Sequence, residues 1–112
     1  MDFDQILERS FTDTGNVFTS HVDDPARYIA DAIESIRSSR CEPFLLKAPV
    51  MEPGFEGKEL GDIVEGYCLA HSAGYWLVYH PKEEVFYCFW GLRRDSLGAR
   101  GVTGSALECW LG

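Results

Sequence analysis

The sequence has no segment typical of export or of a membrane span. Its apolar runs stay well below the about 18 residues that a helix needs to cross a bilayer. The first residues, Met1-Asp2-Phe3-Asp4, are acidic, whereas an export leader begins with basic residues. A chain of 112 residues is long enough to bury one hydrophobic core. We therefore expect a cytoplasmic protein with a single domain over residues 1–112.

The sequence also lacks the motifs of common catalytic and nucleotide-binding sites. It contains no G-x-x-x-x-G-K-[ST], G-x-S-x-G or H-E-x-x-H string. Gly98, Gly101 and Gly104 recur at every third position, but no long helix follows them. We interpret residues 98–104 as a surface loop with glycine turns rather than as a phosphate-binding loop. We predict that the protein is not an enzyme.

Cysteine is present, but not in a pattern that binds metal. Cys41, Cys68, Cys88 and Cys109 are 27, 20 and 21 residues apart, and no C-x-x-C occurs. Three of the four lie in apolar segments, where a free cysteine behaves as a small hydrophobic residue. We predict buried thiols, no metal and no cofactor.

Basic residues are scarce in the first part of the chain. The net charge is −8, and residues 1–65 contain 14 acidic and 6 basic residues, whereas residues 66–112 contain four of each. A segment with this excess of negative charge repels nucleic acid and attracts basic proteins. We therefore expect a basic protein partner, with no direct contact to nucleic acid or membrane.

Aromatic residues, by contrast, are concentrated in one stretch. Residues 75–90 read YWLVYHPKEEVFYCFW, a composition that favours β-strand, and the interruption at Pro81 predicts a hairpin. Both arms place apolar side chains on both faces. The hairpin is therefore either covered on both sides or covered on one side and open to a partner.

The hairpin and the preceding segment 63–72 predict a three-stranded antiparallel meander. Suppose that the numbers of two facing residues add up to about 146 between the first and second strands, and to about 165 between the second and third. One face of the sheet then carries Cys68, Val78 and Tyr87. His71 and Cys88 then lie on the other face. Because no histidine lies beside Cys68 in this register, a Cys–His nucleophile is not expected.

Capping residues precede three segments with helical periodicity. We predict helices over 3–11 and 106–111, and one that is capped by Asp23 or Asp24, starts at Pro25 and is ended by Ser38-Ser39-Arg40. Segment 42–50 has a proline near each end, Pro43 and Pro49, and is expected as an edge strand or as a strand with both ends pinned. The predicted fold class is α+β, with two N-terminal helices packed on an antiparallel β-meander and a short C-terminal helix.

Residues 51–66 combine glycine and proline with five acidic side chains: Glu52, Glu56, Glu59, Asp62 and Glu65. One interpretation is a solvent-exposed loop. The other is an acidic contact surface in which Met51 and Phe55 are apolar anchors. The sequence leaves both open.

The pattern as a whole resembles the small acidic immunity proteins of bacterial polymorphic-toxin and contact-dependent inhibition systems. The similar features are a short acidic chain, two N-terminal helices, the aromatic meander YWLVYHPKEEVFYCFWG and the glycine-punctuated end LGARGVTGSALECWLG. The resemblance implies a protein that neutralises a cognate, nuclease-like toxin domain by occlusion and performs no catalysis.

Chemistry indicates which residues would contact such a partner. Carboxylates steer and orient a basic protein, and buried aromatic anchors hold it. The predicted partner-binding residues are Glu52, Phe55, Glu56, Glu59, Asp62, Glu65 and Tyr67.

Two other functions fit the same sequence. A curved sheet would hold a small ligand in a pocket lined by Tyr67, Trp76, Tyr87 and Trp90. Alternatively, an uncovered sheet face forms a homodimer. Salt separates these alternatives, because association with a basic protein slows as ionic strength rises and binding of an apolar ligand hardly responds.

Overall fold

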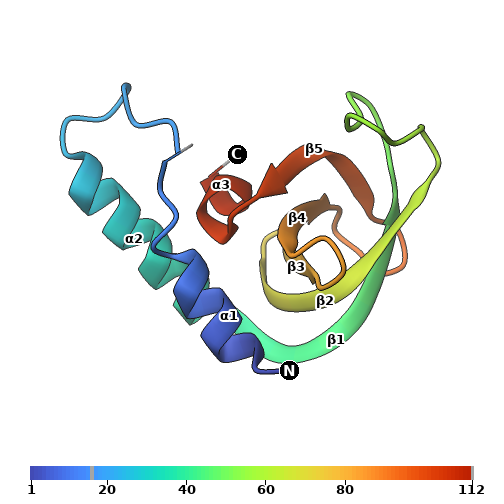
Figure 1. Ribbon diagram of the computed structural model, residues 1–112, viewed down its shortest axis with the longest axis horizontal. Helices are drawn as coiled ribbons and strands as arrows, with labels where there is room; N and C mark the ends of the chain where they lie inside the picture. Colours follow the sequence, from blue (N-terminus) through green and yellow to red (C-terminus); the bar gives the residue numbers. More distant parts are fainter. Residues whose placement is uncertain (16, 112) are drawn as a thin grey trace.

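Five antiparallel strands and three helices form an α+β fold in the computed structural model, which describes residues 1–15 and 17–111 (Figure 1). In chain order the elements are α1 (Phe3–Ser10), α2 (Pro25–Ser38), β1 (Arg40–Pro49), β2 (Ile63–Ser72), β3 (Tyr75–His80), β4 (Val85–Trp90), β5 (Gly98–Gly104) and α3 (Ala106–Leu111). The strands follow one another in the sheet in the order β1-β2-β3-β4-β5. Among the described residues, no helix has the length and apolar character to cross a membrane.

Each helix begins at a capping residue, as the sequence predicts. The Asp2 carboxylate accepts the Gln5 backbone N–H at 3.0 Å, and the Asp24 carboxylate accepts that of Arg27 at 3.2 Å. The Ser105 hydroxyl accepts the Glu108 backbone N–H at 3.2 Å. These bonds satisfy N–H groups that have no partner within the helix, which fixes where each helix starts.

The central hairpin has the predicted register, and the strand before it departs from the prediction at one point. In β3 and β4, Tyr75 pairs with Trp90 and His80 with Val85. Between β2 and β3 the predicted pairing holds at Cys68, but a bulge follows, and Ala70 pairs with Leu77. A bulge adds one residue to a strand, so every side chain after it lies on the opposite face of the sheet from the one that a regular strand would give.

The bulge corrects the placement of His71. Leu69 and Ala70 both face the same hydrophobic cluster, so His71 turns to the opposite side of the sheet from the one predicted. There its ring stacks on Trp76, with centroids 4.6 Å apart. His71 and Cys88 therefore do not share a face. Cys68, Val78 and Tyr87 do lie in one cluster, as predicted.

The helices cover one face of the sheet, and we call the cluster beneath them the helix-side core. The helix that lies directly on β3, β4 and β5 is α3, with α2 and α1 beside it (Figure 1). The buried members of this core are Leu7, Phe11, Ala32, Ile36, Leu69, Ala70, Leu77, Tyr79, Phe86, Cys88, Ala106, Leu107 and Cys109. Trp110 and Leu111 pack against it at the end of the chain.

The sheet covers its other face by curling on itself. Val50, directly after β1, forms a parallel bridge with Ala99 in β5, which brings the two edge strands together. The cluster enclosed by this curl, here called the inner core, consists of Leu46, Ala48, Val50, Val64, Cys68, Val78, Tyr87, Phe89, Leu97 and Ala99. The aromatic hairpin is therefore covered on both sides.

This arrangement contradicts the small-ligand pocket considered above. Tyr67 and Trp90 pack against the helix-side core, whereas Tyr87 belongs to the inner core and Trp76 packs against it. The sheet separates the two pairs, so the four rings do not line one cavity.

The prediction of a loop over residues 98–104 is also wrong, because these residues form β5 and pair with β4. Its glycines allow close packing against the segment that follows β1. A Cβ atom at Gly101 would lie 3.0 Å from the Gly54 carbonyl oxygen and 3.0 Å from Pro53 Cγ, and one at Gly98 would collide with the Met51 sulfur. Glycine in a strand here marks the approach of another chain segment.

Candidate protein-binding surface

Two carboxylates on α1 are paired with arginine. Glu8 on α1 accepts hydrogen bonds from Arg37 on α2, with Nε and Oε2 3.1 Å apart, and Asp4 pairs with Arg40. The Arg37 guanidinium lowers the pKa of Glu8. These acids hold elements of the fold together, so they are poorly placed to attract a partner.

Carboxylates after β1 have no such partners. Among the described residues, none of Glu52, Glu56, Glu59 and Glu65 forms an ion pair, and all four side chains are exposed. Lys58 lies between these acids in the sequence, and its Nζ is 3.6 Å from the Glu83 carboxylate in the turn between β3 and β4. The excess of negative charge in residues 51–62, here called the acidic loop, therefore faces solvent without local compensation.

The backbone of the acidic loop is fixed at both ends. At the start, the Met51 N–H donates to the Ala99 carbonyl of β5 at 2.8 Å. At the end, the Gly61 N–H donates to the Val50 carbonyl at 2.8 Å, and the Val50 N–H to the Asp62 carbonyl at 2.7 Å. The Asp62 carboxylate accepts the Glu59 N–H at 2.9 Å. Asp62 thus shapes the loop rather than projecting from it.

A cluster of side chains fastens the middle of the acidic loop to the turn between β3 and β4. The Phe55 ring meets the Tyr87 ring edge to face, with centroids 5.2 Å apart. The Tyr87 hydroxyl donates to the Glu83 carboxylate at 2.7 Å, and Lys58 approaches the same carboxylate. The hydrogen bond from Tyr87 lowers the pKa of Glu83. A loop held in this way keeps its carboxylates in place before any partner arrives.

The same cluster is poorly suited to catalysis. Burial and the Glu83 carboxylate raise the pKa of Tyr87, so its hydroxyl stays protonated. His80 Nδ1 accepts the Glu83 backbone N–H at 3.1 Å, which closes the turn. The buried thiols are also unreactive, because burial raises the pKa of Cys88 to about 11 and raises those of Cys68 and Cys109 as well. In the described part of the chain, no three His, Cys, Asp or Glu side chains converge as metal ligands.

The predicted partner-binding residues do not form one surface. Glu52, Glu56 and Glu59 lie together on the acidic loop. Phe55 packs inward toward the inner core, whereas Tyr67 lies on the opposite face, with its ring 4.8 Å from that of Phe3. Glu65, two residues before Tyr67, is on that same outer face of β2. The two predicted aromatic anchors are therefore separated by the sheet.

Three exposed aliphatic side chains, one within the acidic loop and two on the strands that flank it, were not among the predicted contact residues. Leu45 is 58% exposed, Leu60 58% and Ile63 60%. Leu45 and Ile63 lie on the same face of β1 and β2 as Tyr67, on a part of that face that stays exposed to solvent. The sequence contains a hint of this, because three consecutive apolar residues in an edge strand, Phe44-Leu45-Leu46, must direct one side chain outward.

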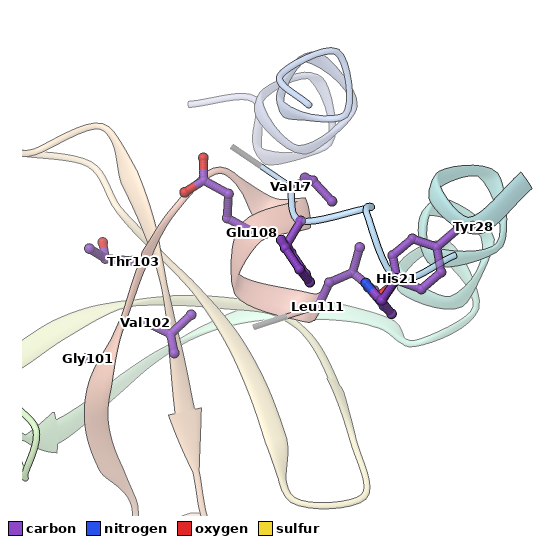
Figure 2. Close-up of a pocket in the computed structure, with 9 residues that line it drawn as sticks. Val17, His21, Tyr28, Gly101, Val102, Thr103, Glu108 and Leu111 are labelled. Carbon is purple, nitrogen blue, oxygen red and sulfur yellow. The ribbon is translucent and has the colours of Figure 1, made fainter. Parts of the chain in front are cut away.

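A separate hollow of about 490 Å³ lies between the segment before α2 and the strand β5 (Figure 2). Its walls are Val17, Phe18, His21, Tyr28, Gly101, Val102, Thr103, Glu108 and Leu111. Figure 2 shows His21 and Tyr28 at one end and Val102 and Thr103 at the other. Gly101 also lies against Pro53 and Gly54 at the start of the acidic loop.

No protein-family model, no curated protein and no solved structure matches this chain. The function therefore has to be argued from the chemistry of the acidic loop and of the exposed side chains beside it.

Proposed function

We propose that this protein is an immunity-type inhibitor that acts in the cytoplasm and neutralises a basic, nuclease-like toxin domain by covering its surface. The observation that supports this most is the acidic loop, in which exposed, unpaired carboxylates are held by a fixed backbone. Exposed Leu60 lies within the loop, and exposed Ile63 directly follows it. A prearranged acidic surface with apolar neighbours is what binding to a basic protein requires.

The charged and the apolar side chains have different roles in this proposal. Glu52, Glu56 and Glu59 raise the association rate by attracting the partner, and Glu65 extends the charge onto β2. Leu60 and Ile63 slow dissociation by burying apolar area against the partner. Phe55 and Asp62 act indirectly, because they hold the loop in shape.

A homodimer is the second candidate, favoured by the exposed Leu45 and Ile63. In a twofold dimer the same surface meets itself. Such a contact would bring two acidic loops close together, and the net charge of −8 on each chain opposes it. Light scattering over a range of protein concentrations tests this directly, because a dimer doubles the mass of 12.6 kDa.

Charge reversal on the acidic loop tests the proposed function. The double variant Glu56→Lys/Glu59→Lys should slow association with the toxin domain encoded by the neighbouring gene and should abolish protection. The control is Asp13→Lys/Glu34→Lys, which reverses two exposed acids that form no ion pair with any described residue. Each reversal adds two charges, so both variants have a net charge of −4 in place of −8.

Comparing the two variants separates the effect of charge on the acidic loop from the effect of the total charge of the molecule. We expect the loop variant to lose far more association rate than the control at physiological salt. Equal association rates for the loop variant and the unmodified protein would exclude the acidic loop as the binding surface. An equal loss of association rate in both variants would show that only the net charge of the molecule matters.

A further inference from the structure

We propose that a second hollow, where the two ends of the acidic loop meet, receives one aliphatic side chain from a basic segment of the partner. This inference rests on the proposed function and names the kind of side chain that the loop binds. The hollow has a volume of about 470 Å³ and is lined by Val50, Met51, Glu52, Leu60 and Arg100. Three of these side chains are apolar, and the other two carry opposite charges.

Hydrogen bonds hold the backbone of the walls. The Val50 carbonyl accepts the Gly61 N–H at 2.8 Å, and the Val50 N–H donates to the Asp62 carbonyl at 2.7 Å. The Met51 N–H donates to the Ala99 carbonyl in β5 at 2.8 Å. Walls that are fixed in this way lose little conformational freedom when a side chain enters the hollow.

The apolar lining has a buried floor and accessible sides. Val50 is 2% exposed, whereas Met51 is 39% and Leu60 58% exposed. The Met51 side chain lies against Gly98 of β5, where an added Cβ would overlap the sulfur atom and lie 3.4 Å from Arg100 Nε. An aliphatic side chain in the hollow would remove apolar surface of Met51 and Leu60 from water, which stabilises the complex.

The charges at the hollow disfavour an ionic occupant of either sign. Arg100 lines the hollow and forms no ion pair with any described residue, so an entering lysine or arginine would meet a like charge. An entering carboxylate would be repelled by Glu52 and by the rest of the acidic loop, and the apolar floor would leave it poorly solvated. An uncharged apolar side chain avoids both costs.

Basic residues beside the aliphatic one have a place next to the hollow. A neighbouring depression of about 600 Å³ shares Glu52 and Leu60 with the hollow and is also lined by Glu56 and Lys58. The Lys58 ammonium group is 3.6 Å from Glu83, whereas Glu52 and Glu56 form no ion pair with any described residue. A flanking lysine or arginine of the partner would therefore find two unpaired carboxylates there.

The test titrates three peptides into the whole protein: acetyl-Lys-Gly-Leu-Gly-Lys-amide, the same peptide with Asn in place of Leu, and the same peptide with Glu in place of both Lys. The spacing puts the leucine and the lysines on one side of an extended peptide. Asparagine is close to leucine in shape but is polar. Methyl resonances of Val50, Met51 and Leu60 report binding by NMR.

We expect saturable shifts with the Lys/Leu peptide. Its affinity should exceed that of the asparagine peptide about 3- to 10-fold and that of the glutamate peptide about 2- to 5-fold. Equal affinity of the leucine and asparagine peptides, or no saturable shift, would overturn the inference. Tighter binding of the glutamate peptide would also overturn it, because the occupant would then come from an acidic chain, such as a second copy of this protein.

Matched variants locate the site. Leu60→Asn and Met51→Gln keep the approximate shape of each side chain and should each weaken the Lys/Leu peptide about 2- to 5-fold. The control is Leu45→Asn, because Leu45 is 58% exposed, as Leu60 is, but does not line the hollow. Unfolding curves verify that each variant keeps the fold. Unchanged affinity in both hollow variants, or an equal loss in the control, would show that the peptide binds elsewhere.

The peptide results are independent of the partner. If Glu56→Lys/Glu59→Lys loses the toxin domain but the Lys/Leu peptide does not bind, the hollow is wrong and the proposed function stands. If the peptide binds as expected and the loop variant keeps the toxin domain, the hollow stands as a site for an aliphatic side chain and the proposed function fails.

Discussion

At the scale of single residues, two carboxylates differ from the rest because they join separate elements. Glu8 connects α1 to α2 through Arg37, and Glu83 connects the β3–β4 turn to the acidic loop through Tyr87 and Lys58. The pKa of each is lowered, for Glu8 mainly by the hydrogen bond from Arg37 and for Glu83 mainly by that from Tyr87. Ionised Glu83 therefore stabilises the folded state as well as the loop.

The lowered pKa makes this stabilisation depend on pH. A carboxyl group with a lower pKa in the folded state stabilises the fold above its unfolded pKa of about 4.3, and this contribution is lost as the pH falls below it. Glu83→Gln should lower the free energy of unfolding at pH 7 by less than about 1 kcal/mol, because the Glu83 side chain is 41% exposed and solvent screens the interaction. Urea unfolding of both proteins at pH 7 and pH 3 measures this difference in the free energy of unfolding.

The difference between Glu83→Gln and the unmodified protein should shrink as the pH falls from 7 to 3, because protonation removes the charge of Glu83. Glu84→Gln is the control, since the Glu84 carboxylate is exposed and forms no ion pair with any described residue. An equal loss of stability at both pH values would mean that Gln disturbs packing rather than removing a charge.

At the scale of elements, the contact between β5 and the acidic loop depends on glycine. Gly101 has φ +88°, and a Cβ there would lie 3.0 Å from a backbone oxygen of the loop. Gly57, within the loop, has a similar φ of +80°, but a Cβ added at Gly57 would meet no atom within 4 Å. Gly57 and Gly101 therefore share a left-handed backbone conformation, but only at Gly101 would a side chain meet a neighbouring segment.

Gly101→Ala should therefore destabilise the protein more than Gly57→Ala. Both substitutions incur the left-handed backbone cost of about 1–2 kcal/mol, and Gly101→Ala adds steric overlap of about 1–3 kcal/mol. Hydrogen exchange at the Met51 amide, which donates to Ala99, should accelerate in Gly101→Ala alone. Similar exchange in the two variants would show that the loop is not held by its contact with β5.

Local chemistry accounts for most of the elements that the sequence predicts correctly. Caps at Asp2 and Asp24 fix the helix starts, and the interruption at Pro81 fixes the register of the central hairpin. The bulge after Cys68 has no such marker, because Leu69 and Ala70 are both apolar and either fits the core. The strand β5 is not predictable from residues 98–104 alone, because its glycines follow from a tertiary contact.

The proposed binding surface is predictable from the sequence in its charge but not in its apolar part. The density of acids in residues 51–62 is visible in the sequence, whereas the inward packing of Phe55 on Tyr87 depends on the curl of the sheet. The same curl leaves Ile63 on the outside. Leu60 and Arg100 are 40 residues apart in the sequence, so their shared hollow is a property of the fold.

At the scale of the whole molecule, the charge of −8 acts over distances that salt controls. The molecule measures 38 × 29 × 26 Å. The Debye length is about 30 Å at 0.01 M salt and about 8 Å at 0.15 M. At low salt a partner therefore senses every charge on the molecule, and at physiological salt it senses only those near the contact.

This difference predicts a crossover between the two charge-reversal variants. At 0.01 M salt, Glu56→Lys/Glu59→Lys and Asp13→Lys/Glu34→Lys should both associate more slowly with the basic partner than the unmodified protein, since both have lost half of the net charge. At about 0.15 M salt the control should recover to within about 2-fold of the unmodified rate, while the loop variant stays slow. Stopped-flow association rates at the two salt concentrations measure this. A control that stays as slow as the loop variant at the higher salt concentration would mean that association depends on the net charge of the molecule and not on the position of the acidic loop.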